Sequence, residues 1–595
     1  GYVRDDSRNR RLESAFARHA VTRIRAWIAL RMEQAVPATP MLGVLQGLAV
    51  GDAQKVSPEQ WRVFAATGTT HLMAISGLHI TMLAALAAWF GGGIVRWRNA
   101  QARGWSAMHG RVIAGAGAAV TYSILAGLSI PTQRTLIMLC MYFAMRWRRR
   151  ELPVAHALGV ALIAILLVDP FAPLAAGAWL SFGAVALILL VTSGRLVQDG
   201  VVRGFVRVQA AITVGLAPLL LVAFGGISLL APVANAVAVP LFTLLIVPGV
   251  LAGALAAAVH PMVGALVLWV PAQLLEWIWP PLAWLAEQPL ALWYVAQPSW
   301  PALAAMIIGV ALLLLPGIWP TRAVGVLLCL PVLLNRPAAP AVGDFDLALL
   351  DVGQGLSVVI RTRAHALVYD AGPSFRSGRD AADLAVLPYL RHRGVRRLDK
   401  VVISHGDLDH SGGLRSLLAS MPVQSLLAGP SVKPLPREAT ICRSGRRWSW
   451  DGVLFEVLHP PDVVYEGDND SSCVVRVQGR GGSAVLTGDI EATAEAELGR
   501  RGLARADVVI VPHHGSRTSS SAALVAALQP RFALFSAGYR NRWDLPKADV
   551  VERWRAVGAR TLTTAASGAI EIELESGEPP RVREYRRSHR RYWNR

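Results

Sequence analysis

The chain has 595 residues, of which 53% are hydrophobic and 17% charged, and its formal net charge is +19. Soluble globular proteins usually carry about 25% charged residues, so this composition argues against a wholly soluble chain. The apolar residues are concentrated between about residues 70 and 334, in runs long enough for helices that cross a bilayer core of about 30 Å. We therefore expect an integral membrane protein, in which the positive charge fits cytoplasmic loops as well as an anionic ligand.

The first segment, residues 1–36, is basic and carries apolar residues near helical spacing among its arginines. This pattern indicates an amphipathic helix, which would either lie on a membrane surface or pack against the next domain. Because the chain begins at Gly1 without a signal peptide, we expect a longer native N-terminus.

The next segment, residues 37–336, is predicted to be a polytopic α-helical membrane domain of about ten spans. Three prolines within residues 229–259 are expected to interrupt that run, and the tryptophan-rich stretch 281–300 is typical of a membrane interface. The predicted spans are residues 71–95, 108–128, 132–146, 154–169, 174–193, 205–224, 229–259, 262–280, 301–316 and 320–334.

The distribution of arginine predicts the orientation of these spans. Arginines follow the first, third and fifth spans, whereas the loops between them carry almost no basic charge, so the arginine-rich loops are expected in the cytoplasm. Counting on from there places the chain after residue 335 outside the cytoplasm, beyond an inner (cytoplasmic) membrane. The same count places residues 1–36 outside, so either their charge serves a ligand or a further pass lies near residues 40–50.

Four polar residues of the membrane region are candidate functional residues, because ionisable side chains within a span usually face a pathway or a partner. His71 and His79 are eight residues apart and would share a helical face. Alternatively, His71 lies at the interface and His79 bonds a backbone carbonyl. Arg134 would contact phosphate or extend to the lipid headgroups, and Asp52 is open to similar alternatives.

After residue 340 the pattern changes to short apolar strands that alternate with helices, which predicts an α/β domain over residues 341–580. Cys442 and Cys473 lie in this domain and would pair only in an oxidising compartment. The last segment, residues 581–595, is rich in arginine and aromatic residues. It would either bind single-stranded nucleic acid or remain a disordered basic tail.

The strongest motif of the α/β domain follows the predicted strand 400–403. It holds His405, Asp407, Asp409 and His410, four metal-ligand types within six residues at a strand end. The spacing places His405 and Asp407 on one side of an extended turn, so that Asp409 and His410 can face a second ion. Two ions about 3.5–4 Å apart would clamp the attacking and leaving oxygens of a substrate.

Two other strand ends carry candidate ligands. Asp489 follows the predicted strand 484–487 and would either bridge two ions or cap the helix that starts at Glu491. His513 and His514 follow the next strand, and at least one is expected to bind metal or to act as an electrophile near a phosphate. The predicted catalytic residues are Asp409, Asp489, His513 and His514; the predicted metal ligands are His405, Asp407, Asp409, His410, Asp489 and His513.

The motif at residues 405–410 resembles the metallo-β-lactamase superfamily signature His-x-His-x-Asp-His, with Asp407 in place of the second histidine. With the segments around it, this variant resembles the C-terminal domain of the ComEC DNA-internalisation (competence) family. The membrane region is similar to that family's competence domain. The segments that carry the resemblance are residues 45–52, 67–80, 129–134, 181–183, 351–355, 369–372 and 512–516. The family's soluble N-terminal domain of the OB type is not found in this sequence.

The resemblance implies an αββα fold for the C-terminal domain and a role in DNA uptake. Double-stranded DNA would reach the outer face, a nuclease would degrade one strand, and the other strand would cross the membrane. The implied partners are DNA, the lipid bilayer, a DNA receptor and cytoplasmic single-strand-binding or translocation proteins. Two divalent metal ions are expected, and Mn²⁺ is favoured over Zn²⁺ or Mg²⁺ because Asp407 makes the donor set richer in oxygen.

The sequence departs from the family pattern at two places near the predicted site. Leu356 stands where the family often has Asp, and Asp544-Leu545 stand where it often has a His before Pro546. A missing His would remove a proton donor or a ligand. Two alternatives therefore remain: a DNA channel with an inactive DNA-binding domain, or a membrane-anchored metallo-hydrolase of small esters.

Overall fold

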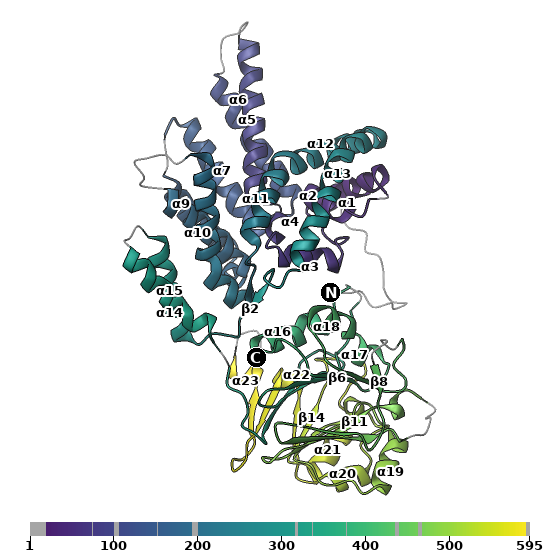
Figure 1. Ribbon diagram of the computed structural model, residues 1–595. Helices are drawn as coiled ribbons and strands as arrows, with labels where there is room; N and C mark the ends of the chain where they lie inside the picture. The colour runs from purple at the N-terminus through teal and green to yellow at the C-terminus, as the bar shows by residue number, and fades with distance from the viewer. Residues whose placement is uncertain are drawn as a thin grey trace. The chain divides into compact units, whose positions relative to one another are not determined.

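The protein is described by a computed structural model in which the chain divides into two compact units (Figure 1). Unit 1 comprises Gly1–Tyr294 and Pro298–Leu334, and unit 2 comprises Val295–Gln297 and Asn335–Arg595. The structure describes residues 20–37, 39–73, 75, 77–99, 106–150, 153–192, 200–315, 319–335, 337–375, 378–434, 439–461 and 467–590.

Unit 1 is helical, and each predicted apolar run coincides with helical structure. Four segments are long and apolar enough to cross a membrane, at Gly77–Arg98, Val202–Phe224, Ala231–Val259 and Pro261–Ala286. Four shorter apolar helices also match predicted runs, so the count of about ten spans stays a prediction. The helices are α1 (Ala20–Ala35), α2 (Leu42–Val50), α3 (Pro58–Ala66), α4 (Thr70–Met73), α5 (Gly77–Asn99), α6 (Ala107–Leu125), α7 (Ile130–Trp147), α8 (Val154–Val168), α9 (Ala176–Thr192), α10 (Val201–Phe224), α11 (Ala231–Leu241), α12 (Val247–Val259), α13 (Pro261–Ala286), α14 (Trp300–Leu314) and α15 (Trp319–Leu333).

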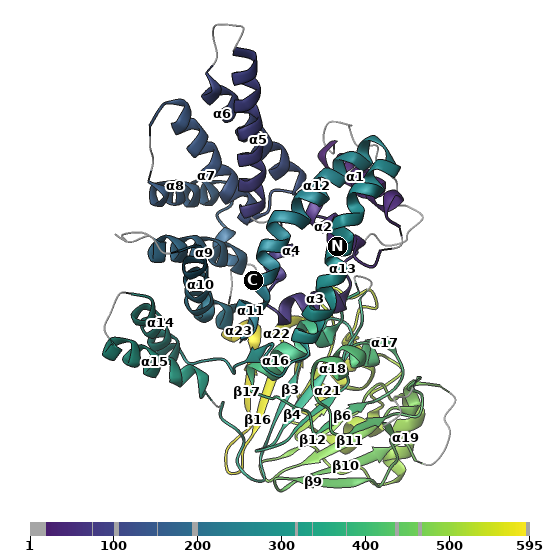
Figure 2. The same ribbon diagram turned by 45° about the horizontal axis from the view of Figure 1, so that its top comes forward.

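The N-terminal helix α1 packs within unit 1, beside α12 and α13 (Figure 2). Ala29 and Met32 are buried in this contact, and Gln46 of α2 donates a hydrogen bond to the Ala29 carbonyl at 2.8 Å. These contacts favour the packed alternative for the described part of the segment, while residues 1–19 lie outside the described residues. Helix α2 has nine residues, too few to cross a bilayer core, so it does not supply the further pass considered near residues 40–50.

The run 229–259 is continuous rather than broken. A π-helical turn, η3 (Phe242–Ile246), joins α11 to α12 and lies just before Pro248, which is in the first turn of α12. Proline has no N–H to donate to the helical hydrogen bonds, and a wider turn accommodates it so that the helix continues.

The structure shifts two helix boundaries, while the interfacial location of residues 281–300 stays a prediction. The interfacial stretch 281–300 begins inside α13, which continues to Ala286, and then forms the short strand β2 (Trp293–Tyr294) paired with β1 (Gly226–Ile227). The span predicted at 71–95 begins only at Gly77, because α4 ends at Met73.

Unit 2 is an αββα sandwich of two mixed sheets. One sheet has eight strands in the order β17-β16-β3-β4-β5-β6-β7-β8, and the other has seven in the order β15-β14-β13-β12-β11-β10-β9. The strands are β3 (Phe345–Leu349), β4 (Val358–Arg361), β5 (Ala366–Tyr369), β6 (Lys400–Ile403), β7 (Leu426–Ala428), β8 (Ala439–Ile441), β9 (Arg447–Trp450), β10 (Val453–His459), β11 (Val474–Gln478), β12 (Ser483–Leu486), β13 (Val508–Ile510), β14 (Phe532–Phe535), β15 (Arg560–Thr563), β16 (Ile570–Leu574) and β17 (Arg581–Glu584).

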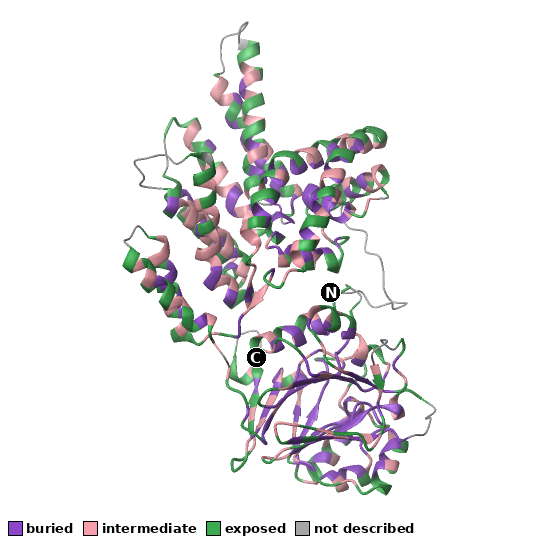
Figure 3. Cartoon of the chain, in the orientation of Figure 1, coloured by how far each residue is buried: buried purple, intermediate pink, exposed green. Residues whose placement is uncertain are grey.

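Three apolar layers hold this sandwich together. The central layer lies between the sheets and contains residues such as Phe345, Val475 and Leu534, which are buried (Figure 3). The outer face of the eight-stranded sheet is covered by η4 (Ala382–Val386), α16 (Leu387–His392) and α18 (Leu414–Ser420). The outer face of the other sheet is covered by α19 (Ala492–Arg500), α20 (Ala522–Leu528) and α21 (Ala548–Ala556).

The predicted basic tail is partly folded. Residues Arg581–Glu584 form β17, which pairs antiparallel with β16 at the edge of the eight-stranded sheet, and α23 (Tyr585–Ser588) follows it. Arg583 forms an ion pair with Glu573 at 3.1 Å, so this arginine has an acidic partner within the fold. Residues 591–595 lie outside the described part of the chain.

Candidate metal centre

The candidate site collects the carboxyl ends of strands from both sheets. In the eight-stranded sheet, β5 and β6 lie parallel, and in the other sheet β12, β13 and β14 do. Because the chain leaves parallel strands at one edge, polar residues that follow them converge there. The short helix α17 (Leu408–Ser411) carries the second half of the motif that follows β6.

Two overlapping clusters of metal-ligand types lie at this edge among the described residues. The first cluster is His405, His410 and Asp489, and the second cluster is Asp409, His410 and His514. Within each cluster the candidate ligand atoms all lie within 4.8 Å of one another. His410 Nε2 lies 3.2 Å from Asp489 Oδ1, and His514 Nε2 lies 3.4 Å from Asp489 Oδ2. The two oxygens of Asp489 therefore face different imidazoles, as a bridging carboxylate requires.

The buried atoms of these clusters fit a divalent metal ion. His405 Nε2 and Asp489 Oδ1 are buried and make no hydrogen bond within the part of the chain that the structure describes. A buried polar atom without a hydrogen bond costs free energy, which metal coordination would recover. The donor set mixes imidazole with carboxylate, which suits Zn²⁺ and Mn²⁺ more than a thiolate-preferring ion.

The electrostatics of the clusters point to a missing positive charge. Burial lowers the pKa of His410, but the carboxylates of Asp489 and Asp370 outweigh it and raise that pKa well above its usual value. Burial raises the pKa of Asp489, but His410 and His514 outweigh it and hold that pKa well below its usual range. The carboxylates thus draw protons onto the imidazoles, and a bound cation would supply this charge while the imidazoles stay neutral.

Two predicted ligands lie beside the clusters rather than in them. Asp407 has a half-exposed side chain, and its Oδ2 is 3.6 Å from His405 Nε2. His513 has its Nδ1 3.0 Å from Glu491 Oε1 and 3.1 Å from Thr518 Oγ1, so that ring nitrogen is engaged. Its Nε2 lies 3.9 Å from Asp489 Oδ2, at the rim of the site.

The histidine pair differs in burial, which the sequence did not resolve. His514 is buried and joins the second cluster through Nε2. Its Nδ1 lies 2.9 Å from the Ser536 carbonyl oxygen, within hydrogen-bonding distance. Both histidines have positive φ values, 48° and 55°, so consecutive side chains leave the turn after β13 in different directions. His514 was predicted as catalytic, and its place in the second cluster makes it a candidate ligand as well.

The alternative role of Asp489 as a helix cap is wrong. The N-cap of α19 is Glu491, without a side-chain cap hydrogen bond. Asp470 Oδ1 instead accepts hydrogen bonds from the backbone N–H groups of Glu491 and Ala494, at 2.8 and 3.3 Å. Asp489 is therefore free of the helix terminus and faces the clusters.

A buried carboxylate behind the clusters was missed by the sequence reasoning. Asp370 follows β5, is fully buried, and its Oδ2 lies 2.8 Å from His410 Nδ1. It also accepts hydrogen bonds from the Ser404 N–H at 2.6 Å and the Ser404 hydroxyl at 2.7 Å. A carboxylate on the far nitrogen of a ligating imidazole fixes its tautomer and raises its basicity. The position of Asp370 directly after a buried strand was the available signal.

We expect Asp370→Asn to weaken metal binding by about 10–100-fold, the usual range for a group directly behind a histidine ligand. An amide keeps the shape but removes the negative charge that favours an N–H on His410 Nδ1. Affinity can be measured by competition with a chromogenic chelator on the full chain in detergent. Asp380→Asn is the matched control, because Asp380 is also buried but bonds Ser416. Equal affinity in the two variants would contradict the role of Asp370.

The membrane-region candidates do not gather into one site. His71 lies on α4 with an exposed side chain and its Nδ1 3.0 Å from the Gly68 carbonyl, whereas His79 is buried on α5. The prediction that both share one helical face is wrong, because α4 and α5 are separate helices. Asp52 accepts a hydrogen bond from the Gln54 N–H at 3.2 Å, as in a local turn.

Arg134 is buried between helices. Its guanidinium donates to the Ser181 carbonyl of α9 and lies 5.8 Å from the ring centre of Phe182. This contact joins α7 to α9, and the two roles predicted for Arg134, contact with phosphate and extension to the headgroups, stay predictions.

The two departures from the family pattern lie in different surroundings. Leu356 is buried, and its N–H donates to the Asp409 carbonyl at 3.1 Å, so this backbone supports the motif from behind. Asp544 is exposed in the loop that follows β14. Asn541 holds this loop: its side chain donates to the carbonyls of Gly538 and Leu545 and accepts from the Leu545 N–H.

The same loop carries exposed pairs of arginine and aromatic residues. Arg540 lies over the Tyr539 ring at 5.2 Å, and Arg542 lies over the Trp543 ring at 4.1 Å. Tyr539 and Trp543 are 69% and 48% exposed, which is high for large aromatic side chains. The loop is anchored at the site, since Ser536 before it bonds His514 and the Lys547 N–H after it donates to the Gly515 carbonyl at 3.0 Å. We call residues 539–543 the arginine–aromatic loop.

A disulfide lies directly behind the site. Cys442 and Cys473 are joined, with a Cα–Cα distance of 5.9 Å, and both are buried. The Cys473 N–H donates to the Ser404 carbonyl at 2.9 Å, and the neighbouring Ser472 hydroxyl lies 3.4 Å from His405 Nδ1. Of the two predicted states of these cysteines, the structure has the paired one.

The fold and the site together define a class of protein: a polytopic membrane unit joined to a metallo-β-lactamase-like domain. Residues 48–320 match the family described as competence protein, and residues 350–539 match the metallo-β-lactamase superfamily. The chain belongs to the competence protein family of the ComA/ComEC type.

Three relatives show how far this similarity extends. Competence protein ComA of Neisseria gonorrhoeae is 36% identical over 557 residues, covering 92% of this chain and 77% of the relative. The uncharacterized protein YcaI of Escherichia coli is 32% identical, covering 93% of this chain and 73% of that protein. ComE operon protein 3 of Bacillus subtilis is 27% identical, covering 90% of this chain and 71% of that protein. The similarity therefore includes both units.

Proposed function

We propose that this protein is the DNA uptake channel of natural transformation and that its C-terminal unit is a metal-dependent DNA nuclease. In this proposal, unit 1 spans the inner membrane about ten times and carries one strand to the cytoplasm, while unit 2 lies outside the cytoplasm and degrades the other strand. DNA, the bilayer, a DNA receptor and cytoplasmic single-strand-binding or translocation proteins are the partners. Membership of the competence family supports the uptake role.

The observation that supports the nuclease is the pair of clusters that overlap at His410, with Asp489 in the first cluster and 3.4 Å from His514 of the second. An imidazole nitrogen has a single lone pair, so His410 Nε2 can serve one ion only. A carboxylate has two oxygens, so Asp489 can bridge two ions. We therefore assign Asp409, His410 and His514 to one ion, and His405 and Asp407 to the other, with Asp489 between them.

The chemistry follows from this arrangement. Two divalent ions, which we propose to be Mn²⁺ because the donor set is rich in carboxylate, would activate water and stabilise charge on the phosphate. Asp370 keeps the His410 ring oriented. His513, held by Glu491 and with Nε2 directed at Asp489, is placed at the rim to bond a phosphate oxygen or to donate a proton to the leaving oxygen.

The arginine–aromatic loop supports DNA as the substrate rather than a small ester. Its guanidinium groups can contact backbone phosphates, and the exposed faces of Tyr539 and Trp543 can stack on bases. The loop is anchored to His514 and to the next residue, Gly515, so a strand lying on it would pass the clusters. The disulfide supports a location outside the cytoplasm, because such bonds persist in oxidising compartments.

The experiment that tests this function measures hydrolysis of end-labelled single- and double-stranded oligonucleotides by the full chain in detergent. We expect cleavage with Mn²⁺, less with Mg²⁺ or Zn²⁺, and none with chelator. A small phosphodiester serves as a second substrate that is too short to reach the arginine–aromatic loop. No hydrolysis of either substrate by a metal-loaded protein would leave a channel with an inactive domain, and hydrolysis of small esters alone would favour the anchored hydrolase.

We expect the double variant Arg540→Gln/Arg542→Gln to raise KM for the oligonucleotide relative to KM for the small phosphodiester. The salt dependence of oligonucleotide binding should fall by about 0.7 in log–log slope for each arginine removed, the value for one contact with a single-stranded phosphate. The matched control is Arg505→Gln/Arg531→Gln. These two exposed arginines precede β13 and β14, whereas the site lies at the carboxyl ends of these strands. Equal KM changes for both substrates would contradict strand binding by this loop.

A further inference from the structure

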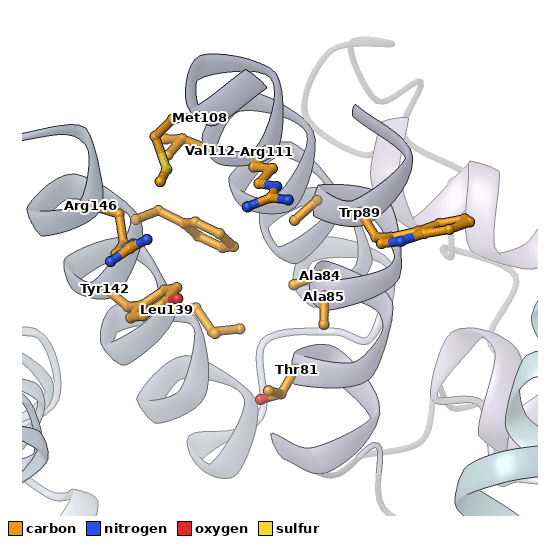
Figure 4. Close-up of a pocket in the computed structure, with 12 residues that line it drawn as sticks. Thr81, Ala84, Ala85, Trp89, Met108, Arg111, Val112, Leu139, Tyr142 and Arg146 are labelled. Atoms are coloured by element: carbon orange, nitrogen blue, oxygen red, sulfur yellow. The ribbon is translucent and has the colours of Figure 1, made fainter. Parts of the chain in front are cut away.

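A cavity of about 480 Å³ lies in unit 1 between α5, α6 and α7 (Figure 4). It is not part of the metal centre, and none of the four membrane-region candidates lines it. Its lining residues are Thr81, Ala84, Ala85, Ala88 and Trp89 of α5, Met108, Arg111 and Val112 of α6, and Leu139, Tyr142, Phe143 and Arg146 of α7.

Glycines let the three helices around this cavity approach closely. Helices α5 and α6 approach closely at Gly91, where a Cβ would lie 2.5 Å from the Gly110 carbonyl oxygen. The Arg111 side chain lies across Gly92, where a Cβ would be 2.6 Å from Arg111 Cγ. The Phe143 ring lies against Gly115 in the same way, at 2.4 Å. A larger side chain at any of these glycines would force the neighbouring helix, or the Arg111 or Phe143 side chain that lines the cavity, to move.

The lining is basic at one end and apolar along the rest. Figure 4 shows the Arg111 and Arg146 guanidinium groups directed into the same space from two helices, with Thr81 at the opposite end and Ala84, Ala85 and Leu139 between. None of the lining residues that the structure describes is acidic. Two cations that converge on a space without acidic residues repel each other, so an anion between them would be stabilised.

The basic end belongs to the arginine-rich side of the helices. It lies where α5 ends, α6 begins and α7 ends, beside Arg96 and Arg98 of α5 and Arg148–Arg150 after α7. Arginines near helix ends commonly reach the headgroup layer while their stems stay in apolar surroundings. The outer surface of α5 next to the cavity is apolar and exposed, at Leu86 and Phe90, as expected for contact with acyl chains.

We propose that this cavity binds an anionic phospholipid. Its phosphate lies between Arg111 and Arg146, the Tyr142 hydroxyl is available to the headgroup, and an acyl chain follows Ala84, Ala85 and Leu139. Basic pockets between membrane helices on the cytoplasmic side are known to take anionic headgroups. A lipid suits this lining better than a DNA strand, because the apolar wall continues directly from the charged end. Neither nuclease activity nor DNA uptake is required for this site.

The test is native mass spectrometry of the full chain in detergent, titrated with phosphatidylglycerol or with zwitterionic phosphatidylcholine. We expect phosphatidylglycerol to bind more tightly, and Arg111→Gln/Arg146→Gln to lower its affinity by about fivefold for each arginine, or about twenty-fivefold in total. The matched control, Arg148→Gln/Arg149→Gln, removes two exposed arginines outside the cavity and should keep the affinity within about twofold of wild type, the scatter expected between surface variants.

A second variant tests whether the loss of binding by the arginine double variant comes from misfolding. Ala85→Leu keeps both arginines but fills the apolar part, so it should also lower phosphatidylglycerol affinity. The proposal is overturned if both lipids bind equally or if Ala85→Leu binds lipid as the wild type does. It is overturned as well if Arg111→Gln/Arg146→Gln and Arg148→Gln/Arg149→Gln change the affinity equally. It is also overturned if a single-stranded oligonucleotide, rather than lipid, depends on Arg111 and Arg146. Each outcome is independent of whether unit 2 hydrolyses DNA.

Discussion

Asp489→Ala is expected to abolish metal-dependent DNA hydrolysis, with a loss greater than about a hundredfold. Loss of a residue that only supports a ligand from behind costs up to about a hundredfold in metal affinity or activity, whereas in the proposed assignment Asp489 would itself be a ligand, since its two oxygens face His410 and His514. Without its carboxylate, the imidazoles of His410 and His514 would lose the charge that favours a cation between them. End-labelled oligonucleotide cleavage with Mn²⁺ measures the loss, and elemental analysis of the purified chain should show less bound metal.

The control for this variant is Glu552→Gln, which removes a carboxylate that is 72% exposed on α21 and pairs only with Arg555 among the ion pairs described. It should cleave DNA as the wild type does. Retained cleavage by Asp489→Ala at saturating Mn²⁺ would show that the metal site does not depend on this bridge. A loss of activity together with full metal content would place Asp489 in proton transfer instead of metal binding.

Cys442→Ser/Cys473→Ser is expected to destabilise unit 2 by about 3–4 kcal/mol. The disulfide closes a loop with a sequence separation of 31, and the entropy of closing a loop of that length accounts for a stabilisation of this size. The strand end held by Cys473 also touches Ser404, so the metal site should loosen with it.

Resistance of unit 2 to a short protease pulse in increasing urea measures this effect on the full chain. Reductant should shift the wild-type midpoint toward that of the double variant. Cys140→Ser/Cys329→Ser is the matched control, since these are free cysteines in unit 1 and should leave the midpoint unchanged. A midpoint that responds neither to substitution nor to reductant would mean that the sandwich does not depend on this bond.

Sequence alone predicted the helical runs and the main motif well, for physical reasons. Bilayer-length apolar runs have one stable backbone solution, the helix, so their existence is fixed by composition. Helix ends are less constrained, and for that reason the break between α4 and α5 and the extension of α13 were missed. The π-helical turn at Phe242–Ile246 lies just before Pro248, and the sequence indicated a break in this run rather than a wider turn.

The main motif of the site was predictable because its residues adjoin in the chain, and Asp489 and His514 were predicted from their places at strand ends. His405 to His410 could be recognised as a unit because a single turn brings them together. Asp370 could not be assigned, because its contact with His410 is made between residues 40 positions apart. The distinction between His513 and His514 depends on two successive positive φ values, which residue type does not predict. Likewise, the contact of Arg134 with α9 depends on helix packing.

The clusters take their residues from the ends of strands in two different sheets. His405 and His410 follow β6, and Asp489 and His514 follow β12 and β13, so any ion held between them would tie one layer of the sandwich to the other. Ligand binding that requires both layers to be in register stabilises only the folded arrangement, by an amount that grows with the logarithm of the free ion concentration. The supply of that ion would then set how long unit 2 survives proteases, making the lifetime of unit 2 a readout of the metal available to it.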